Sequence, residues 1–175
     1  MSADPLDIPV RLADDGAAIT LREVIGGQAT LVILMRHLDC PFCEVYVGQV
    51  VRDRDDLGRV VLVGNASPAE LRAIHADLPH EVVVVADETQ ALYRAWRTGR
   101  LRSLLGLRIR PRSVPTFLRH LVTGGRISRP GQDLLLLGGD VIVDADGTTA
   151  WMRPSTRPDD RPELDELGTQ LRRAA

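Results

Sequence analysis

The chain contains no lysine, because all 22 of its basic residues are arginine. Catalysis through a Schiff base and a Walker-type phosphate loop both need a lysine, so both are excluded. No apolar run reaches the roughly 18 to 20 residues of a membrane span. The net charge is only -2, with a pI near 6.1. Composition therefore gives no reason to expect nucleic acid or an anionic membrane as a partner.

Cysteine is also scarce, with two residues in 175. The first 13 residues show neither a basic n-region nor a long apolar stretch, so no secretory signal is predicted and we expect a cytoplasmic protein. In that reducing compartment, two closely spaced cysteines are typically redox-active or metal-binding. The length suits one domain. We expect residues 1–17 to form an N-terminal arm, loose or as a short strand, and residues 18–175 to form a single domain.

The central feature of the sequence is the apolar run Leu31–Met35, which ends just before Cys40 and Cys43. A continuous apolar run of this length is typical of a strand that is buried on both faces of a sheet. After the cysteines, apolar residues recur at helical spacing up to Arg54, and Pro41 suits the first turn of such a helix. The thiols therefore lie where the positive end of a helix dipole favours their ionisation.

Strands and helices alternate along the rest of the chain. Runs of β-branched residues predict buried strands at 60–63 and 82–85. Ser67 and Glu70 have the spacing of a capping box, which predicts a helix start between the two strands. Further predicted elements are helices at 89–96, 114–122 and 164–171, and a hairpin with strands 140–144 and 149–152. This alternation predicts a three-layer α/β architecture.

These features together resemble a known family. Cys40-Pro41-Phe42-Cys43 after a buried strand is similar to the thioredoxin fold. Three further stretches narrow the resemblance to the peroxiredoxin-like branch of the alkyl-hydroperoxide-reductase and thiol-specific-antioxidant superfamily. They are Val60-Val61-Leu62-Val63-Gly64, Val84-Val85-Ala86-Asp87 with Ala91-Leu92-Tyr93, and the stretch from Leu137 to Gly147. The resemblance covers about residues 17–170 and implies a thioredoxin-like three-layer α/β/α sandwich with a mixed central sheet.

The same resemblance implies a function. We expect a thiol-dependent oxidoreductase whose catalytic residues, Cys40 and Cys43, cycle between dithiol and disulfide. The implied substrate is a peroxide or a disulfide, and the implied reductant is a thioredoxin-type protein or a low-molecular-weight thiol. We expect no organic cofactor, no metal, and neither nucleic acid nor membrane as a partner. A homodimer is compatible with the sequence.

The resemblance leaves open which cysteine attacks. In a thioredoxin-like site, Cys40 attacks and Cys43 resolves the intermediate. Peroxiredoxins carry a Pro-x-x-x-Thr/Ser-x-x-Cys pattern, in which the final cysteine attacks. Aligning Cys43 with that cysteine places Cys40 at the Thr/Ser position and Arg36 at the proline position. Counting from Cys40 instead places His37 and Ile33 at those positions. Neither register satisfies the pattern, whereas the Cys-x-x-Cys motif itself supports dithiol-disulfide exchange.

The reactivity of the pair depends on what lowers a thiol pKa. The candidates are the free amides of the helix, the partner thiol, Arg36 and His37. Asp39 and Glu44 act in the opposite direction, because negative charge beside a thiol raises its pKa. If these carboxylates keep the thiols protonated, the alternative is a non-catalytic binding or redox-sensing protein with the same fold.

Two segments compete for the place of the thioredoxin loop that packs against the cysteines. Val114-Pro115-Thr116 resembles the cis-proline of that loop, but the residues after it have helical spacing, so we interpret Pro115 as part of a helix start. Leu137-Gly138-Gly139 fits better, because glycine lets a backbone approach another group closely. Gly138 and Gly139 therefore join the candidate site.

Three further readings of the sequence stay open. A pathway-specific enzyme could reuse the fold for an unusual substrate. The cysteines are also compatible with small apolar core residues, or with a zinc site that includes His37 and Asp39. The arginine cluster at 97–112 is interpreted as a solvated surface or as a patch for an anion or acidic partner.

Overall fold

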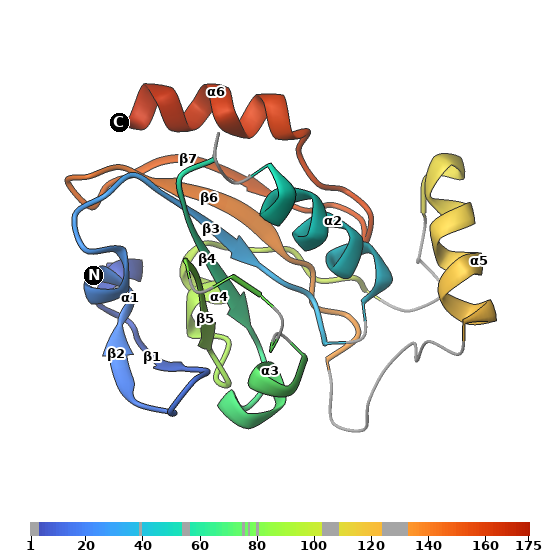
Figure 1. Cartoon of the computed structure of the whole chain (residues 1–175), viewed down its shortest axis with the longest axis horizontal. Helices are drawn as coiled ribbons and strands as arrows, with labels where there is room; N and C mark the ends of the chain where they lie inside the picture. Colours follow the sequence, from blue (N-terminus) through green and yellow to red (C-terminus); the bar gives the residue numbers. More distant parts are fainter. Residues whose placement is uncertain are drawn as a thin grey trace.

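The computed structural model describes residues 4–38, 40–53, 57–74, 76, 78–79, 81–102, 109–123 and 133–175. Asp39 and part of the arginine cluster lie outside these residues. The elements are η1 (Pro5–Asp7), β1 (Pro9–Leu12), β2 (Ala18–Thr20), α1 (Leu21–Ile25), β3 (Thr30–Leu34), α2 (Pro41–Arg52), β4 (Arg59–Gly64), α3 (Pro68–Ile74), β5 (Val82–Ala86), α4 (Ala91–Ala95), η4 (Pro111–Ser113), α5 (Val114–Val122), β6 (Gly139–Val143), β7 (Thr149–Pro154) and α6 (Leu164–Ala174) (Figure 1).

The strands form one mixed sheet in the order β2-β1-β5-β4-β3-β6-β7. The three strands β5, β4 and β3 are parallel, whereas β6 and β7 on one side and β1 and β2 on the other run antiparallel to their neighbours. Because β3 pairs with both β4 and β6, it is an interior strand. The interior position explains its unbroken apolar sequence, since all five of its residues are buried.

The side chains of β3 alternate between two hydrophobic cores. Leu31 and Ile33 pack in the core that α2 and α6 cover, and Val32 and Leu34 pack in the core that α1 and α4 cover. This alternation follows from the period of two residues in a strand. Helices therefore cover both faces of the sheet, and the predicted three-layer α/β/α sandwich with a mixed central sheet is confirmed (Figure 1).

Most predicted elements occur where the sequence placed them, and two helices differ in extent. The helix predicted at 89–96 begins at Ala91, because the Asp87 carboxylate accepts the amides of Ala91 and Leu92 and Gln90 takes a left-handed conformation. The spacing of Leu71, Ile74 and Leu78 predicts a helix that runs up to Pro79, whereas α3 extends over Pro68–Ile74. The helix predicted at Val114–Val122 has those bounds.

The N-terminal segment contributes to the sheet. Residues Pro9–Leu12 form β1, which pairs with β2 and with β5. The sequence predicted either a loose arm or a short strand for this segment, and at Pro9–Leu12 the structure has the strand. No helix in the described part of the chain is both long and apolar enough to cross a membrane.

Candidate active site

The two cysteines lie at the junction of β3 and α2. Cys40 is the N-cap residue of α2 and Cys43 lies in its first turn, with Pro41 at the first helical position. Both are free thiols, and their exposed fractions are 1% and 4%. The two thiols are therefore desolvated and lie at the N-terminal, positive end of a twelve-residue helix.

Arg36 holds a buried positive charge beside Cys40. Its Nη1 lies 3.7 Å from the Cys40 Sγ. Its other donors are fixed on backbone carbonyls, Nε on that of Leu136 at 3.1 Å and Nη2 on that of Leu134 at 2.9 Å. Because these carbonyls belong to the segment before β6, a contact across about 100 residues orients the guanidinium toward the thiol.

Arg161 holds a second buried positive charge, and it lies beside Cys43. Its Nη2 is 3.7 Å from the Cys43 Sγ and donates to the carbonyl of Leu34 at 2.9 Å. Its Nη1 donates to the carbonyl of Gly139 at 3.1 Å and to the Asp140 carboxylate at 3.0 Å. Sequence reasoning missed this residue, because it lies in a turn-rich loop 118 positions after Cys43 with no motif around it.

Asp140 and Tyr46 complete the surroundings of Arg161. The Tyr46 hydroxyl donates to the Asp140 Oδ1 at 3.0 Å, while Arg161 donates to Oδ2 and lies 5.2 Å above the Tyr46 ring. Burial raises the pKa of the Asp140 carboxyl, and the contacts with Arg161 and Tyr46 oppose that rise. Both carboxylate oxygens thus have donors, so Asp140 fixes Arg161 in its orientation toward the thiol.

The pKa values of the two thiols move in opposite directions. The hydrogen bond that Cys40 donates lowers the pKa of the Cys43 thiol well below its usual range, and Arg161 and the Arg36 backbone amide lower it further against the effect of burial. Burial, together with that hydrogen bond to Cys43, raises the pKa of the Cys40 thiol. Of the two thiols, Cys43 is therefore the one whose ionisation the site favours.

The remaining predicted site residues have varied positions. His37 is buried, and its backbone carbonyl accepts the amide of Cys40 at 3.2 Å. Glu44 is exposed on α2, where water screens its charge from the sulfurs. Asp39 lies outside the described residues. Gly138 and Gly139 lie at the start of β6, beside Arg161.

Gly138 is the tighter of the two glycines. A Cβ atom at this position would lie 2.1 Å from the Leu34 carbonyl oxygen and 2.7 Å from Nη2 of Arg161. The close approach is therefore to the end of β3 and to the arginine that contacts Cys43. At Gly139, the nearest atoms to an added Cβ belong to the Arg153 and Pro154 backbone of β7, at 3.2 Å and 3.3 Å.

A cavity of about 290 Å³ opens beside this cluster, between α2, the η4–α5 segment and the loop before α6. Its lining includes Tyr46 and Arg161, together with Phe42, Gln49, Ser113 and Thr116. A small molecule in this cavity would thus contact the guanidinium that touches Cys43. Among the described residues, no group of three His, Cys, Asp or Glu side chains is placed to hold a metal ion.

The architecture and the position of the thiols define a thioredoxin-like fold. No family model matches the sequence, and no curated protein matches it. Solved structures do match. Peroxiredoxin Q from Xanthomonas campestris aligns with a TM-score of 0.64 at 16% identity, over 99% of this chain and 95% of that one. Peroxiredoxin 6 from Arenicola marina also aligns at 0.64, with 9% identity, over 95% and 69%.

A third structural neighbour belongs to a different activity class. It is a secreted disulfide oxidoreductase from Mycobacterium tuberculosis, with a TM-score of 0.58 and 12% identity over 98% of both chains. The predicted likeness to peroxiredoxins is thus confirmed at the level of the fold.

Proposed function

We propose that this protein is a thiol-dependent oxidoreductase in which Cys43 attacks the substrate and Cys40 resolves the intermediate. One observation carries the proposal: a buried arginine contacts each sulfur, with Arg161 held against Cys43. The pKa of the Cys43 thiol is lowered and that of the Cys40 thiol is raised, in keeping with these roles. A thiolate is the nucleophilic form of cysteine. Arg161 keeps that form at Cys43, because its guanidinium is held against the sulfur by Asp140.

A hydroperoxide is the substrate class that fits the burial of the sulfurs. With exposed fractions of 1% and 4%, the cysteines are out of reach of a disulfide in another folded protein. The adjacent cavity of about 290 Å³ admits a small molecule. A structural neighbour, the bacterioferritin comigratory protein of X. campestris, has alkyl peroxide reduction activity, which supports the same substrate class.

The first step is attack of the Cys43 thiolate on the terminal oxygen of the hydroperoxide. The O–O bond breaks, Cys43 becomes a sulfenic acid, and the other oxygen leaves as an alkoxide. The alkoxide takes the proton of the Cys40 thiol and leaves as an alcohol. Arg36 and Arg161 are fixed cations beside the sulfurs, so they stabilise the negative charge that moves to the leaving oxygen.

The second step forms the disulfide. Cys40, now a thiolate, attacks the sulfur of the Cys43 sulfenic acid and the S–O bond breaks. The hydroxide that leaves becomes water with the proton that Cys43 releases when it later returns to the thiolate. Two molecules of an external thiol then reduce the disulfide and become a disulfide themselves. Cys40 regains its proton, and Cys43 returns to the thiolate.

The test is consumption of cumene hydroperoxide with dithiothreitol as the reductant, for the wild type, Cys40→Ser and Cys43→Ser. We expect turnover by the wild type, and an intramolecular disulfide in the wild type after one equivalent of peroxide. Cys43→Ser should not consume peroxide, whereas Cys40→Ser, tested without the reductant, should consume one equivalent and stop at the sulfenic acid. A wild type that leaves peroxide unchanged, with both thiols titrating near the unperturbed value of about 8.5, would instead favour the non-catalytic binding protein.

A further inference from the structure

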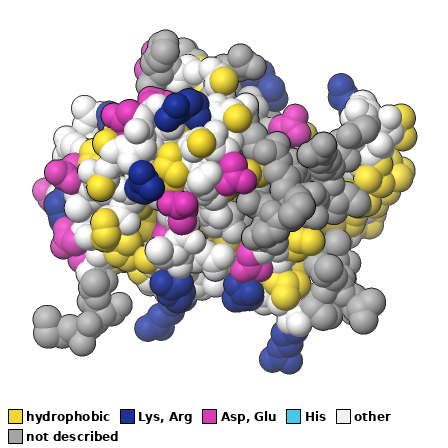
Figure 2. Space-filling view, turned by 90° about the horizontal axis from the view of Figure 1, so that it is seen from below, with side chains coloured by type: hydrophobic (Ala, Val, Ile, Leu, Met, Phe, Trp, Pro, Cys, Tyr) yellow, Lys and Arg dark blue, Asp and Glu magenta, His cyan; other side chains and the backbone are white. Residues whose placement is uncertain are grey.

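Helix α5 covers the turn of α2 that carries the thiols. Phe117 of α5 stacks on Phe42, the residue before Cys43, with the ring centroids 6.3 Å apart. Figure 1 shows α5 beside the first turn of α2 at the margin of the molecule, and Figure 2 shows hydrophobic atoms along that margin. Exposed fractions of 1% and 4% leave Cys40 and Cys43 almost no contact with solvent. A folded protein that approached this turn would therefore meet α5 before either sulfur.

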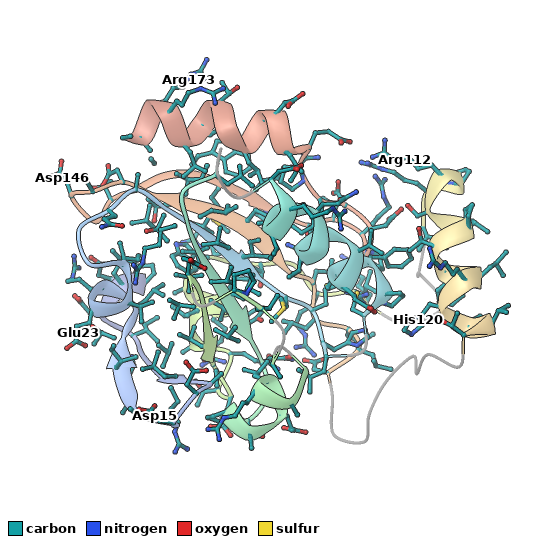
Figure 3. The ribbon with its side chains drawn as sticks, in the orientation of Figure 1. Asp15, Glu23, Arg112, His120, Asp146 and Arg173 are labelled. Carbon is teal, nitrogen blue, oxygen red and sulfur yellow. The ribbon has the colours of Figure 1, made fainter. Side chains whose placement is uncertain are left out.

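Openings of small-molecule size lie along the contact between α5 and α2. One cavity of about 320 Å³ lies between the first turn of α2 and polar side chains of α5. The cavity of about 290 Å³ has Arg161 in its lining, and the Nη2 of this residue is 3.7 Å from the Cys43 Sγ. Figure 3 shows the labelled Arg112, another lining residue, between α5 and the loop before α6, where it pairs with Glu163 at 3.3 Å. Small-molecule sites span roughly 300 to 1,000 Å³, so these volumes admit a small ligand but no part of a folded protein.

The charges at the sulfurs suit a small anionic nucleophile. Arg36 and Arg161 each place a guanidinium 3.7 Å from a sulfur. Among the described residues, Asp140 is the carboxylate that contacts these two groups. The buried cluster therefore lacks one negative charge when the cysteines form a disulfide, which carries none. A thiol attacks a disulfide as its thiolate, so an incoming thiol supplies the missing anion.

We propose that the reductant of this protein is a low-molecular-weight thiol that enters through the cavity of about 290 Å³, and that α5 excludes protein dithiols. The inference rests on the proposed thiol cycle. It selects between the two reductants that the sequence left open, a thioredoxin-type protein and a small thiol. Neither sulfur lines the cavity, so the incoming thiolate meets Arg161 first and draws its Nη2 away from Cys43. The Nη1 of Arg161 stays on Asp140.

Reduction then takes two exchange steps. The small thiolate attacks the Cys43 Sγ, the protein S–S bond breaks, and Cys40 leaves as a thiolate beside Arg36. A second small thiolate attacks the first one in the mixed disulfide, and Cys43 leaves as a thiolate beside Arg161. The small thiols depart as their own disulfide, and two electrons have passed to the protein. Of the two protons that the thiols lose, Cys40 takes one, and the other completes the water formed from the hydroxide of the oxidative step.

The test starts from protein oxidised with diamide, so it needs no peroxide activity. The disulfide is then reduced with dithiothreitol or with reduced thioredoxin at equal dithiol concentration, and the returning thiols are alkylated and counted by mass spectrometry. We expect reduction by dithiothreitol to be at least about tenfold faster, because access limits the protein reductant. Insulin checks that the thioredoxin is active. A thioredoxin rate equal to or above that of dithiothreitol overturns the proposal. If diamide forms no disulfide, the proposed cycle fails together with this inference, before any reductant is added.

The route through the cavity is tested by filling it. Ser113 lines the cavity, so Ser113→Trp should slow reduction by dithiothreitol at least about fivefold. Val114→Trp is the matched control, because it adds the same side chain at the next position, which is exposed and outside the lining. It should reduce at the wild-type rate. Circular dichroism checks that each variant is folded. Equal rates in Ser113→Trp and Val114→Trp overturn the route.

The shielding by α5 is tested at its contact with α2. Phe117→Ala removes the stack on Phe42 and should raise the rate with thioredoxin at least about fivefold, with a smaller change for dithiothreitol. Leu118→Ala is the control at the next position, where the side chain is 53% exposed, and should leave both rates unchanged. A thioredoxin rate that stays at the wild-type value in Phe117→Ala overturns the role of α5.

Discussion

Arg161 and Arg36 bring two positive charges into the protein interior, and the side chains beside them supply two negative charges. In the reduced form that we propose, Asp140 and the Cys43 thiolate balance the two guanidinium groups. Formation of the disulfide removes one of these negative charges, and the buried cluster is left with an excess positive charge. Since uncompensated buried charge is costly, the reduced form is favoured. A site that stabilises the thiolate in this way makes its disulfide a stronger oxidant.

Replacing Arg161 with methionine tests this charge balance. The pKa of the Cys43 thiol should rise, because the variant lacks a cation 3.7 Å from the sulfur. Alkylation by iodoacetamide should then decline as the pH falls from 8 to about 6, whereas the wild type should stay reactive over this range. The equilibrium constant for reduction of the protein disulfide by glutathione should fall about tenfold for each unit by which the pKa of Cys43 rises. This corresponds to a reduction potential that is lower by about 30 mV for a two-electron couple.

Two further variants separate charge from packing in that experiment. Arg161→Lys keeps the charge and should recover part of the reactivity at pH 6. Arg112→Met removes an arginine that is exposed and pairs with Glu163 at 3.3 Å, so it should leave the pH profile unchanged. If Arg161→Met and the wild type have the same pH profile, Arg161 has only a structural role.

Gly138 gives a second prediction for a single residue. In Gly138→Ala the new methyl group would overlap the Leu34 carbonyl and push against Arg161. We expect a loss of about 1–3 kcal/mol in the free energy of unfolding, measured with urea, because a fixed backbone cannot move aside cheaply. Gly48→Ala is the matched control. It lies inside α2 with only the end of the Arg52 side chain nearby, at 3.6 Å, and should be neutral or slightly stabilising.

The residues of the candidate site differ in how well the sequence predicts them. Cys40, Cys43 and Arg36 lie close together in the chain, so the motif and its flanks identified them. Arg161 and Asp140 carry no such signal, since an arginine in a turn-rich loop and an aspartate in a strand occur in many proteins. Their relation to Cys43 exists only after the loop folds back across the end of β3.

At the scale of elements, hydrogen bonds from capping side chains determine where the helices begin. The Ser67 hydroxyl and the Glu70 carboxylate exchange hydrogen bonds with each other's backbone amides, at 3.4 Å and 3.1 Å, so the predicted capping box is confirmed. The start of α4 was misplaced because the capping residue, Asp87, acts from four positions upstream of Ala91. A cap at that distance has no short sequence pattern.

The capping box at α3 gives a prediction for an element. Ser67→Ala removes the acceptor of the Glu70 amide and should lower the free energy of unfolding by about 1 kcal/mol in urea. Ser113→Ala is the control at the start of α5, where the serine side chain makes no capping hydrogen bond, and it should change stability by less than about 0.5 kcal/mol. Equal losses in both variants would mean that the cap of α3 does not contribute.

At the scale of the whole molecule, the loop before α6 connects distant parts of the chain. Asp160 in this loop accepts from Arg110 at 3.1 Å and from Arg153 at 3.3 Å, and its second oxygen accepts the Thr156 amide at 3.1 Å. The neighbouring Arg161 reaches the end of β3. The sequence predicted the sheet and its covering helices, because each has its own apolar period, but it did not predict how a polar loop would join them.

The ion pairs of Asp160 predict a dependence of stability on pH. Burial alone would raise the pKa of this carboxyl, but the Thr156 hydrogen bonds and the charges of Arg153 and Arg110 outweigh burial and lower it. A lowered pKa in the folded state stabilises the protein above the unfolded value of about 3.9, and that contribution is lost as the pH falls further. Asp160→Asn should therefore melt below the wild type at pH 7, with a smaller difference near pH 3.

The sulfenic acid that forms in a single turnover tests the central claim most directly. Cys40→Ser and Cys43→Ser are each exposed to one equivalent of cumene hydroperoxide at about pH 6, with dimedone present, and the modified cysteine is identified by mass spectrometry. The proposed roles predict a dimedone adduct on Cys43 in Cys40→Ser and none in Cys43→Ser, because Cys43 is the thiol proposed to attack the peroxide. An adduct on Cys40 in Cys43→Ser, with Cys43 unmodified in the other variant, would contradict the assignment and make Cys40 the attacking thiol.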